Sequence, residues 1–192
     1  HKADLGIAVD PDVDRLVFVC EDGSFFGEEY TIVAIAKYIL SNRKGNTVSN
    51  LSSSNALKDI TLKYGGRHFH SPVGEANVIK VMKENNAIFG GEGSGGVIFP
   101  DLHYGRDALV GIALFLSLIS RENLKMTELK KMLPKYFMLK EKISISKDFT
   151  FESFLSKYKN SFSKVKDIIL IDGVRINFDC DSWVHIRKSN TE

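Results

Sequence analysis

Short apolar segments alternate with amphipathic segments along much of this chain, and this alternation limits the possible folds more than any other feature. Residues 28–41 and 75–84 repeat apolar side chains at helical spacing, and 52–64 is a shorter segment of the same kind. Strand-length apolar runs separate them, at 5–9, 16–20, 47–51, 67–70 and 87–89. Strands that alternate with helices are typical of a layered domain. We therefore predict a layered α/β domain in this part of the chain.

The pattern changes after the next helix. Residues 107–120 are the most apolar stretch, and we expect a helix there that is buried on nearly all sides. Beyond Pro134, residues 137–146 are predicted to be extended and 148–162 to be helical. Short strands follow at 168–171, 174–178 and 183–186. This succession predicts a second unit of the α+β class that is only partly present.

Composition excludes several classes of protein. Of 192 residues, 43% are hydrophobic, and 26 basic against 24 acidic side chains leave a net charge of +2. This composition fits a folded core and excludes a disordered chain or a nucleic-acid binder. The longest apolar stretch, residues 108–119, is too short to cross a membrane. The two cysteines form no disulfide framework, which favours a reducing, cytoplasmic setting. Because both ends run into structured segments, we interpret the chain as an internal piece of a longer protein.

Three carboxylates stand at alternate positions directly after the first strand, in Asp10-Pro11-Asp12-Val13-Asp14-Arg15. A turn that gathers Asp10, Asp12 and Asp14 would hold a hard divalent cation, and Arg15 could bind a phosphate beside it. A solvated acidic turn is the plain alternative. A helix-loop-helix calcium site is excluded, because Arg15 stands where that loop needs glycine and the flanking segments are strands.

A glycine-rich segment, residues 91–96, follows the strand at 87–89. Its glycines would let a ligand approach the backbone, and Glu92 with Ser94 could bind neighbouring sugar hydroxyls. A glycine cluster is often no more than a flexible loop. Its position favours a ligand site, because ligands of open α/β sheets bind beyond the carboxyl ends of strands.

Three further segments carry polar side chains at suggestive places. Residues 71–75 follow a strand and open a helix, and residues 105–107 open the next helix. In the latter, Asp107 is the expected N-terminal carboxylate of its helix, and Arg106 either packs or binds an anion. Near the end of the chain, Arg187 with Ser189, Asn190 and Thr191 would suit a phosphate cradle.

Taken together and in this order, the motifs resemble the α-D-phosphohexomutase family of phosphoglucomutases, phosphomannomutases and phosphoglucosamine mutases. The resemblance covers nearly the whole chain. Residues 10–15 look like the metal loop of the family, 91–96 its sugar-binding loop, and 187–192 the start of its phosphate-binding loop. It implies a four-domain enzyme, with residues 1–25 ending the second domain, 26–138 forming the third, and 139–192 belonging to a truncated fourth.

The resemblance also implies a mechanism and assigns roles to residues. Hexose 1-phosphate and 6-phosphate would interconvert through a bisphosphate, with Mg²⁺ held by Asp10, Asp12 and Asp14. Arg15 would contact the transferring phosphoryl group, and Glu92 and Ser94 would bind sugar hydroxyls. The other phosphate would be held by Arg187, Ser189, Asn190 and Thr191. The phosphorylated serine of the family has no counterpart here, so we expect this chain alone to be inactive. No nucleic-acid or membrane partner is implied.

The sequence also departs from the family pattern. Pro72 stands where many members carry a lysine that is a candidate general base, which leaves Glu75 and His70 as nearby candidates. Gly96 stands where many members have histidine, and this form leans toward the phosphoglucosamine branch. Two other functions stay open. The chain could be a non-catalytic module that binds a sugar phosphate or a divalent cation. A phosphatase of the Asp-x-Asp class is less favoured, since Asp14 replaces its usual threonine.

Overall fold

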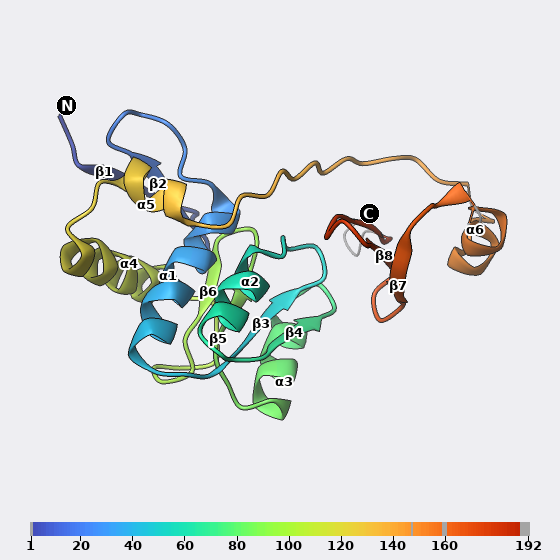
Figure 1. Cartoon of the computed structure of the whole chain (residues 1–192), viewed down its shortest axis with the longest axis horizontal. Coiled ribbons are helices and arrows are strands. Elements are labelled where there is room, and N and C mark those ends of the chain that lie inside the picture. Colours follow the sequence, from blue (N-terminus) through green and yellow to red (C-terminus); the bar gives the residue numbers. More distant parts are fainter. Residues whose placement is uncertain (1, 147, 159–160, 189–192) are drawn as a thin grey trace. The chain divides into compact units, whose positions relative to one another are not determined.

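The computed structural model describes residues 2–146, 148–158 and 161–188. The chain divides into two compact units, His1–Tyr136 and Phe137–Glu192 (Figure 1). Among the described residues, no helix is both long enough and apolar enough to cross a bilayer.

A four-stranded sheet forms the centre of the first unit. Its strands lie in the order β4-β3-β5-β6. They are β3 (Asn46–Asn50), β4 (His68–Ser71), β5 (Ala87–Glu92) and β6 (Gly96–Ile98). The first three strands in this order are parallel, and β6 returns antiparallel to β5 with Glu92 opposite Gly96. The carboxyl ends of β3, β4 and β5 therefore meet at one edge, which is where an open α/β sheet places its ligands.

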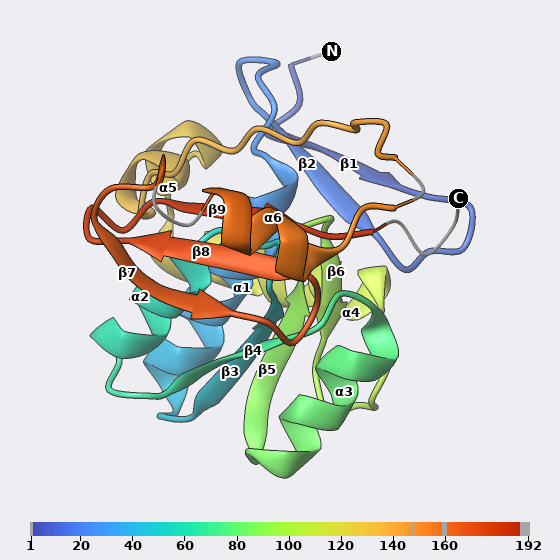
Figure 2. The ribbon, with the colours of Figure 1, turned by 90° about the vertical axis from the view of Figure 1, so that its right-hand side faces the viewer.

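Helices cover both faces of this sheet. They are α1 (Glu28–Asn42), α2 (Ala56–Lys63), α3 (Glu75–Glu84) and α4 (Ala108–Glu122). Figure 2 shows α3 to one side of β5 and α1 with α2 to the other. Side chains of α3 pack with Val48 and Ile98, whereas the neighbouring Val97 joins the larger core formed with α1, α2 and α4. Successive strand residues thus face opposite layers, as the pleat requires, and the predicted α/β class is confirmed.

A hairpin of β1 (Leu5–Val9) and β2 (Leu16–Cys20) forms a separate two-stranded sheet. Alternate β2 residues are buried, and the ring of Phe18 stacks on that of Phe115 in α4 with 3.8 Å between centroids. The strands pair from Leu5 opposite Cys20 to Val9 opposite Leu16, so residues 10–15 form the connecting loop. The hairpin is therefore fixed to the first unit by its β2 face.

The second unit contains α6 (Phe151–Tyr158) and an antiparallel sheet in the order β7-β8-β9. The strands are β7 (Val165–Ile169), β8 (Val174–Phe178) and β9 (Trp183–Ile186). The buried side chain of Arg175 places its guanidinium over the ring of Trp183, 4.3 Å from the centroid, and donates from Nε to Asn177. The predicted strands at 174–178 and 183–186 are confirmed, and so is the predicted α+β class, because this unit combines one described helix with a β-sheet.

Several expectations differ from the structure. Strand β7 spans Val165–Ile169, whereas a strand was expected at 168–171. Helix α4 is not buried on all sides, because Leu109 is 66% exposed and Leu116 is 42% exposed. Because nearly all of its residues are apolar, the sequence shows no helical periodicity that would distinguish the exposed face. Strand β6 and helix α5 (Met126–Met132) were also not predicted, since three residues and seven residues carry too little pattern to be recognised.

Candidate functional site

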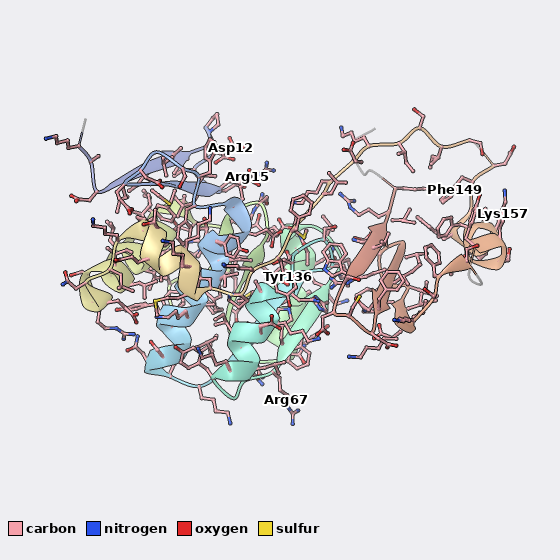
Figure 3. All side chains as sticks on the ribbon, turned by 45° about the horizontal axis from the view of Figure 1, so that its top comes forward. Asp12, Arg15, Arg67, Tyr136, Phe149 and Lys157 are labelled. Atoms are coloured by element: carbon pink, nitrogen blue, oxygen red, sulfur yellow. The ribbon has the colours of Figure 1, made fainter. Side chains whose placement is uncertain are left out.

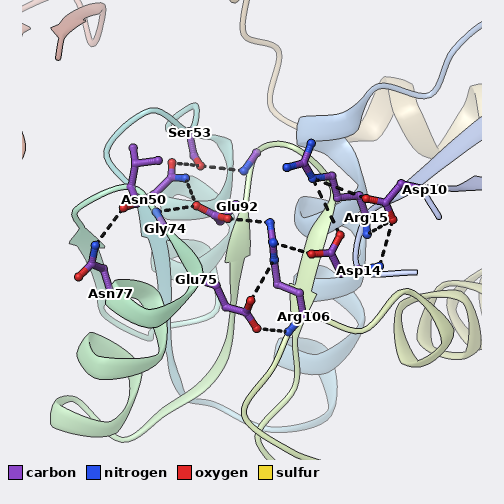
Figure 4. Close-up of polar contacts among 12 residues, drawn as sticks. Asp10, Asp14, Arg15, Asn50, Ser53, Gly74, Glu75, Asn77, Glu92 and Arg106 are labelled. Atoms are coloured by element: carbon purple, nitrogen blue, oxygen red, sulfur yellow. Dashed lines mark hydrogen bonds and ion pairs between the residues drawn. The ribbon is translucent and has the colours of Figure 1, made fainter. Parts of the chain in front are cut away.

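The carboxylate of Glu92, at the end of β5, collects donors from neighbouring segments at the carboxyl edge of the sheet (Figure 4). Its Oε1 accepts a hydrogen bond of 2.7 Å from the side-chain amide of Asn50, at the end of β3. The same oxygen accepts from the backbone N–H of Gly74, the N-cap of α3, at 3.0 Å. Its side chain is 7% exposed, so the protein fixes its orientation before any ligand arrives.

The turn between β5 and β6, residues 93–95, lies directly against the start of β2, and we call it the glycine turn. The carbonyl of Gly95 accepts a hydrogen bond of 3.2 Å from the N–H of Leu16. Gly95 has a φ of +88°, and a Cβ there would lie 2.3 Å from the carbonyl oxygen of Leu16. This position needs glycine for both its backbone conformation and the close approach. The contact brings the glycine turn beside the end of the 10–15 loop.

The 10–15 loop is folded around the carboxylate of Asp10. Its Oδ1 accepts hydrogen bonds of 3.1 Å from the backbone N–H groups of both Asp14 and Arg15. Val13 adopts a φ of +56°, and its carbonyl accepts from the N–H of Ala108 at 3.1 Å. The first turn of α4 therefore also holds this loop in place.

The start of α4 follows the expected capping pattern. Asp107 Oδ1 accepts from the N–H groups of Leu109 and Val110 at 2.8 and 3.0 Å. Burial works against ionisation of Asp107, but hydrogen bonds from His103 and from these backbone groups outweigh it and lower its pKa. The prediction of Asp107 as an N-terminal carboxylate is thus confirmed.

Arg106 joins the loop, the glycine segment and α3 through its own side chain. Its Nη2 lies 2.5 Å from Asp14 Oδ2, and its Nη1 donates to Glu92 Oε2 at 3.1 Å. Its Nε lies 3.4 Å from Glu75 Oε2, and its backbone N–H donates to Glu75 Oε1 at 2.8 Å. The sequence left packing and anion binding open for this residue. In the structure its partners are carboxylates of the protein itself.

Negative charge is crowded at the 10–15 loop. For Asp14, burial and the hydrogen-bonded Asp10 carboxyl outweigh the attraction of Arg106 and raise the pKa above its ordinary value of 3.8. For Asp10, burial works against ionisation, but hydrogen bonds from Arg15 and Asp14 outweigh it and lower the pKa. Two carboxylates in contact, both made of hard oxygen donors, suit a divalent cation.

Comparison with known proteins decides the family. Residues 27–137 match the family model described as phosphoglucomutase/phosphomannomutase, alpha/beta/alpha domain III. The chain belongs to the phosphoglucomutase/phosphomannomutase family. The expected membership is therefore confirmed, and residues 27–137 correspond to a known domain of these mutases.

Relatives of this mutase-family chain include archaeal and bacterial proteins. It is 36% identical over 192 residues to a phosphoglucomutase/phosphomannomutase of Thermococcus kodakarensis, covering 99% of this chain and 41% of the relative. It is 33% identical to a phosphoglucosamine/phosphogalactosamine mutase of Sulfurisphaera tokodaii, covering 100% and 43%. A crystal structure of a family protein from Burkholderia thailandensis superposes with a TM-score of 0.81 at 26% identity, covering 100% and 41%. The chain thus spans about two fifths of these relatives.

The structure brings some of the predicted site residues of this mutase-family chain together. Asp10 contacts Asp14, and Arg106 links Asp14 to Glu92. Arg15 and Asp12 lie exposed on the 10–15 loop (Figure 3), and Ser94 is half-buried in the glycine turn. Among the described residues, no group of three His, Cys, Asp or Glu side chains is gathered as metal ligands. The assignment of Asp10, Asp12 and Asp14 to Mg²⁺ therefore stays a prediction.

The predicted phosphate cradle belongs to the second unit. Arg187 follows β9 and donates from Nη1 to the carbonyl of Lys188 at 3.2 Å. Ser189, Asn190 and Thr191 lie outside the described residues. Their proposed role in binding phosphate stays a prediction, as does the division of the chain at residues 25 and 138.

Sequence reasoning missed two polar residues beside Glu92. Besides Asn50, Ser53 donates to Asn50 Oδ1 at 2.9 Å and accepts from the N–H of Gly93 at 3.0 Å. Asn50 ends β3 and Ser53 follows it, at the carboxyl edge of the sheet. The rule that singled out residues 91–96 would also have singled out Asn50, had it been applied to β3, the neighbour of β5 in the sheet.

Proposed function

We propose that this chain forms the metal-binding and sugar-binding part of a phosphohexomutase, which interconverts hexose 1-phosphates and hexose 6-phosphates through a bisphosphate. The observation that carries the proposal is the link Asp14–Arg106–Glu92. It joins the 10–15 loop, which we call the acidic loop, to the glycine-rich segment 91–96. The loop is suited to a cation and a phosphoryl group, and the segment is suited to a sugar. Family membership supports the same activity, because the relatives are named as mutases.

Glu92 is suited to bind a sugar hydroxyl. An ionised carboxylate can accept about four hydrogen bonds. Donors from the described residues take three of these places, namely Asn50, Gly74 and Arg106. A hydroxyl of the substrate can take the remaining place. Ser94, two residues further on in the same turn, would bind a neighbouring hydroxyl.

The 10–15 loop is suited to the phosphoryl group. Asp10, Asp12 and Asp14 would hold Mg²⁺, which supplies positive charge near the phosphoryl oxygens when bound. The side chain of Arg15 is 55% exposed, with Nε 3.8 Å from Asp10 Oδ2, and its guanidinium would bind a phosphoryl oxygen. Arg187, Ser189, Asn190 and Thr191 would hold the phosphate that is not transferred.

Binding without catalysis is the second candidate function, and one experiment separates the two. The intact protein is incubated with Mg²⁺ and glucose, mannose or glucosamine 1-phosphate, and phosphorus NMR follows the appearance of 6-phosphate. We expect conversion of at least one sugar by the intact protein and none by residues 1–192 alone. Binding of all three sugars without conversion would contradict the mutase and support the binding module. Turnover by residues 1–192 alone would contradict the need for a serine outside this chain.

A further inference from the structure

The guanidinium of Arg106 forms ion pairs with three carboxylates that come from three separate segments. Asp14 lies in the loop between β1 and β2, Glu75 in the first turn of α3, and Glu92 at the end of β5 (Figure 4). The side chain of Arg106 is 15% exposed, so these contacts are largely shielded from water. Its Nη1 donates a hydrogen bond to Glu92, whereas Asp14 and Glu75 are ion-pair partners, and among the described residues its Nε makes no hydrogen bond. Shielded charged contacts hold their geometry better than exposed ion pairs do.

The planar shape of the guanidinium is essential to this arrangement. Each partner meets a different nitrogen: Nη2 faces Asp14, Nη1 faces Glu92, and Nε faces Glu75. A lysine ammonium is a single point charge and cannot hold three partners in three fixed directions. Without the guanidinium, the nearly buried carboxylate of Glu92 would lose its charged partner.

Gly96 provides the space for the arginine stem. A Cβ at Gly96 would lie 2.5 Å from Cδ and 3.2 Å from Cγ of Arg106. The φ of Gly96 is not in the region that favours glycine, so the backbone itself would accept alanine. Gly96 and Arg106 are therefore matched sterically, and a methyl group at position 96 would displace the guanidinium without removing its charge.

We propose that Arg106 is a positioning residue of the mutase reaction, which acts through Asp14 and Glu92 to fix the acidic loop relative to the glycine turn. The proposal rests on the proposed function. Sugar hydroxyls at Glu92 and the phosphoryl group at the 10–15 loop belong to one substrate, so the separation of the two segments decides whether both can be bound at once. Arg106 itself does not touch the reacting atoms.

A purely structural role makes a different prediction. If Arg106 only stabilised the fold, Arg106→Gln would lower the free energy of unfolding and leave kcat and KM of the folded protein unchanged. A positioning role predicts a higher KM and a lower kcat in protein that is fully folded. Hydrogen exchange should then rise together at the N–H of Gly74, which donates to Glu92, and the N–H of Leu16, which donates to Gly95.

The test compares four single variants and one double variant of the intact protein under saturating Mg²⁺. We expect Arg106→Gln to lower kcat/KM by about 100-fold and Arg106→Lys by about 10-fold, since the ammonium restores charge but not direction. Gly96→Ala should lower kcat/KM in the same way, and adding it to Arg106→Gln should cause no further loss. Arg43→Gln breaks an exposed ion pair with Asp101 and serves as the control, with kinetics unchanged.

Two kinetic results would overturn the proposal. One is Arg106→Gln with wild-type kcat and KM, and the other is a double variant whose losses multiply. Failure of the proposed function gives a different result, because the wild-type protein would then convert no hexose phosphate. Hydrogen exchange decides the positioning role in that case as well: unchanged exchange at both Gly74 and Leu16 in Arg106→Gln would contradict it.

Discussion

The side-chain amide of Asn50 donates a hydrogen bond of 2.7 Å to Oε1 of Glu92, which ties the ends of two neighbouring parallel strands together. Both side chains are buried, each with 6% of the residue exposed. The amide therefore holds the carboxylate in place where water cannot replace it. This contact connects the stability of the sheet edge to the proposed sugar site.

Replacing this amide by a carboxylate should destabilise the fold. Asn50→Asp places a second negative charge against Glu92, and we expect a loss of about 2–4 kcal/mol in the free energy of unfolding at pH 7. Urea denaturation measures it. Asn42→Asp is the matched control, because Asn42 is exposed and its Oδ1 accepts from Arg121. A loss at position 50 no larger than at position 42 would show that Glu92 does not depend on the amide.

Glycine at position 95 should be needed for space as well as for backbone conformation. Gly95 and Gly23 have similar φ values of +88° and +84°, but a Cβ at Gly23 meets nothing within 4 Å. Gly23→Ala should cost only the strain of the left-handed conformation, about 1 kcal/mol. Gly95→Ala adds the collision with Leu16, so its loss in denaturation experiments should be clearly larger. Equal losses would mean that the close approach of the turn to β2 does not matter.

A partly buried ion pair should make stability depend on pH. Glu122 Oε1 lies 2.8 Å from Nζ of Lys37, and this hydrogen bond, more than the opposing burial, lowers the pKa of Glu122 below its ordinary value of 4.5. The unfolded chain then binds the proton more readily, so the contribution is full above pH 4.5 and is lost as the pH falls through the lowered pKa.

Glu122→Gln should therefore destabilise the protein by about 1–2 kcal/mol at pH 7 and by less as the pH falls below 4.5. Thermal or urea unfolding of the wild type and the variant between pH 3 and pH 7 measures the difference. A difference that stays constant across this range would show that the charge of Glu122 is not responsible.

Much of the layered domain could be predicted from the sequence, because the spacing of apolar residues distinguishes helices from strands. The helix expected at 75–84 and the strands expected at 5–9, 16–20, 174–178 and 183–186 have those bounds in the structure. Elements with little pattern were missed. Strand β6 is three residues long, and its position is set by pairing with β5 rather than by its own residues.

The candidate site was predictable where polar residues cluster in the sequence, and not where they meet only in space. Asp10, Asp14 and Glu92 stood out because each belongs to a dense motif. Asn50 did not, and Arg106 was singled out without its carboxylate partners, since both roles depend on Glu92, which lies 42 and 14 residues away along the chain. The cluster of Arg106 with its three carboxylates depends on how loops from distant parts of the chain come together. The spacing of residues within one segment does not predict this.

A Mg²⁺ titration of turnover in the intact protein tests the proposed function most directly, with wild type compared to Asp12→Asn. Asp12 is exposed on the acidic loop, so its substitution should not disturb the fold. We expect wild-type turnover to require Mg²⁺, and Asp12→Asn to need a higher Mg²⁺ concentration and to reach a lower maximal rate. Turnover that needs no divalent cation, or an Asp12→Asn variant with the wild-type Mg²⁺ dependence, would contradict the assignment of the acidic loop to the metal.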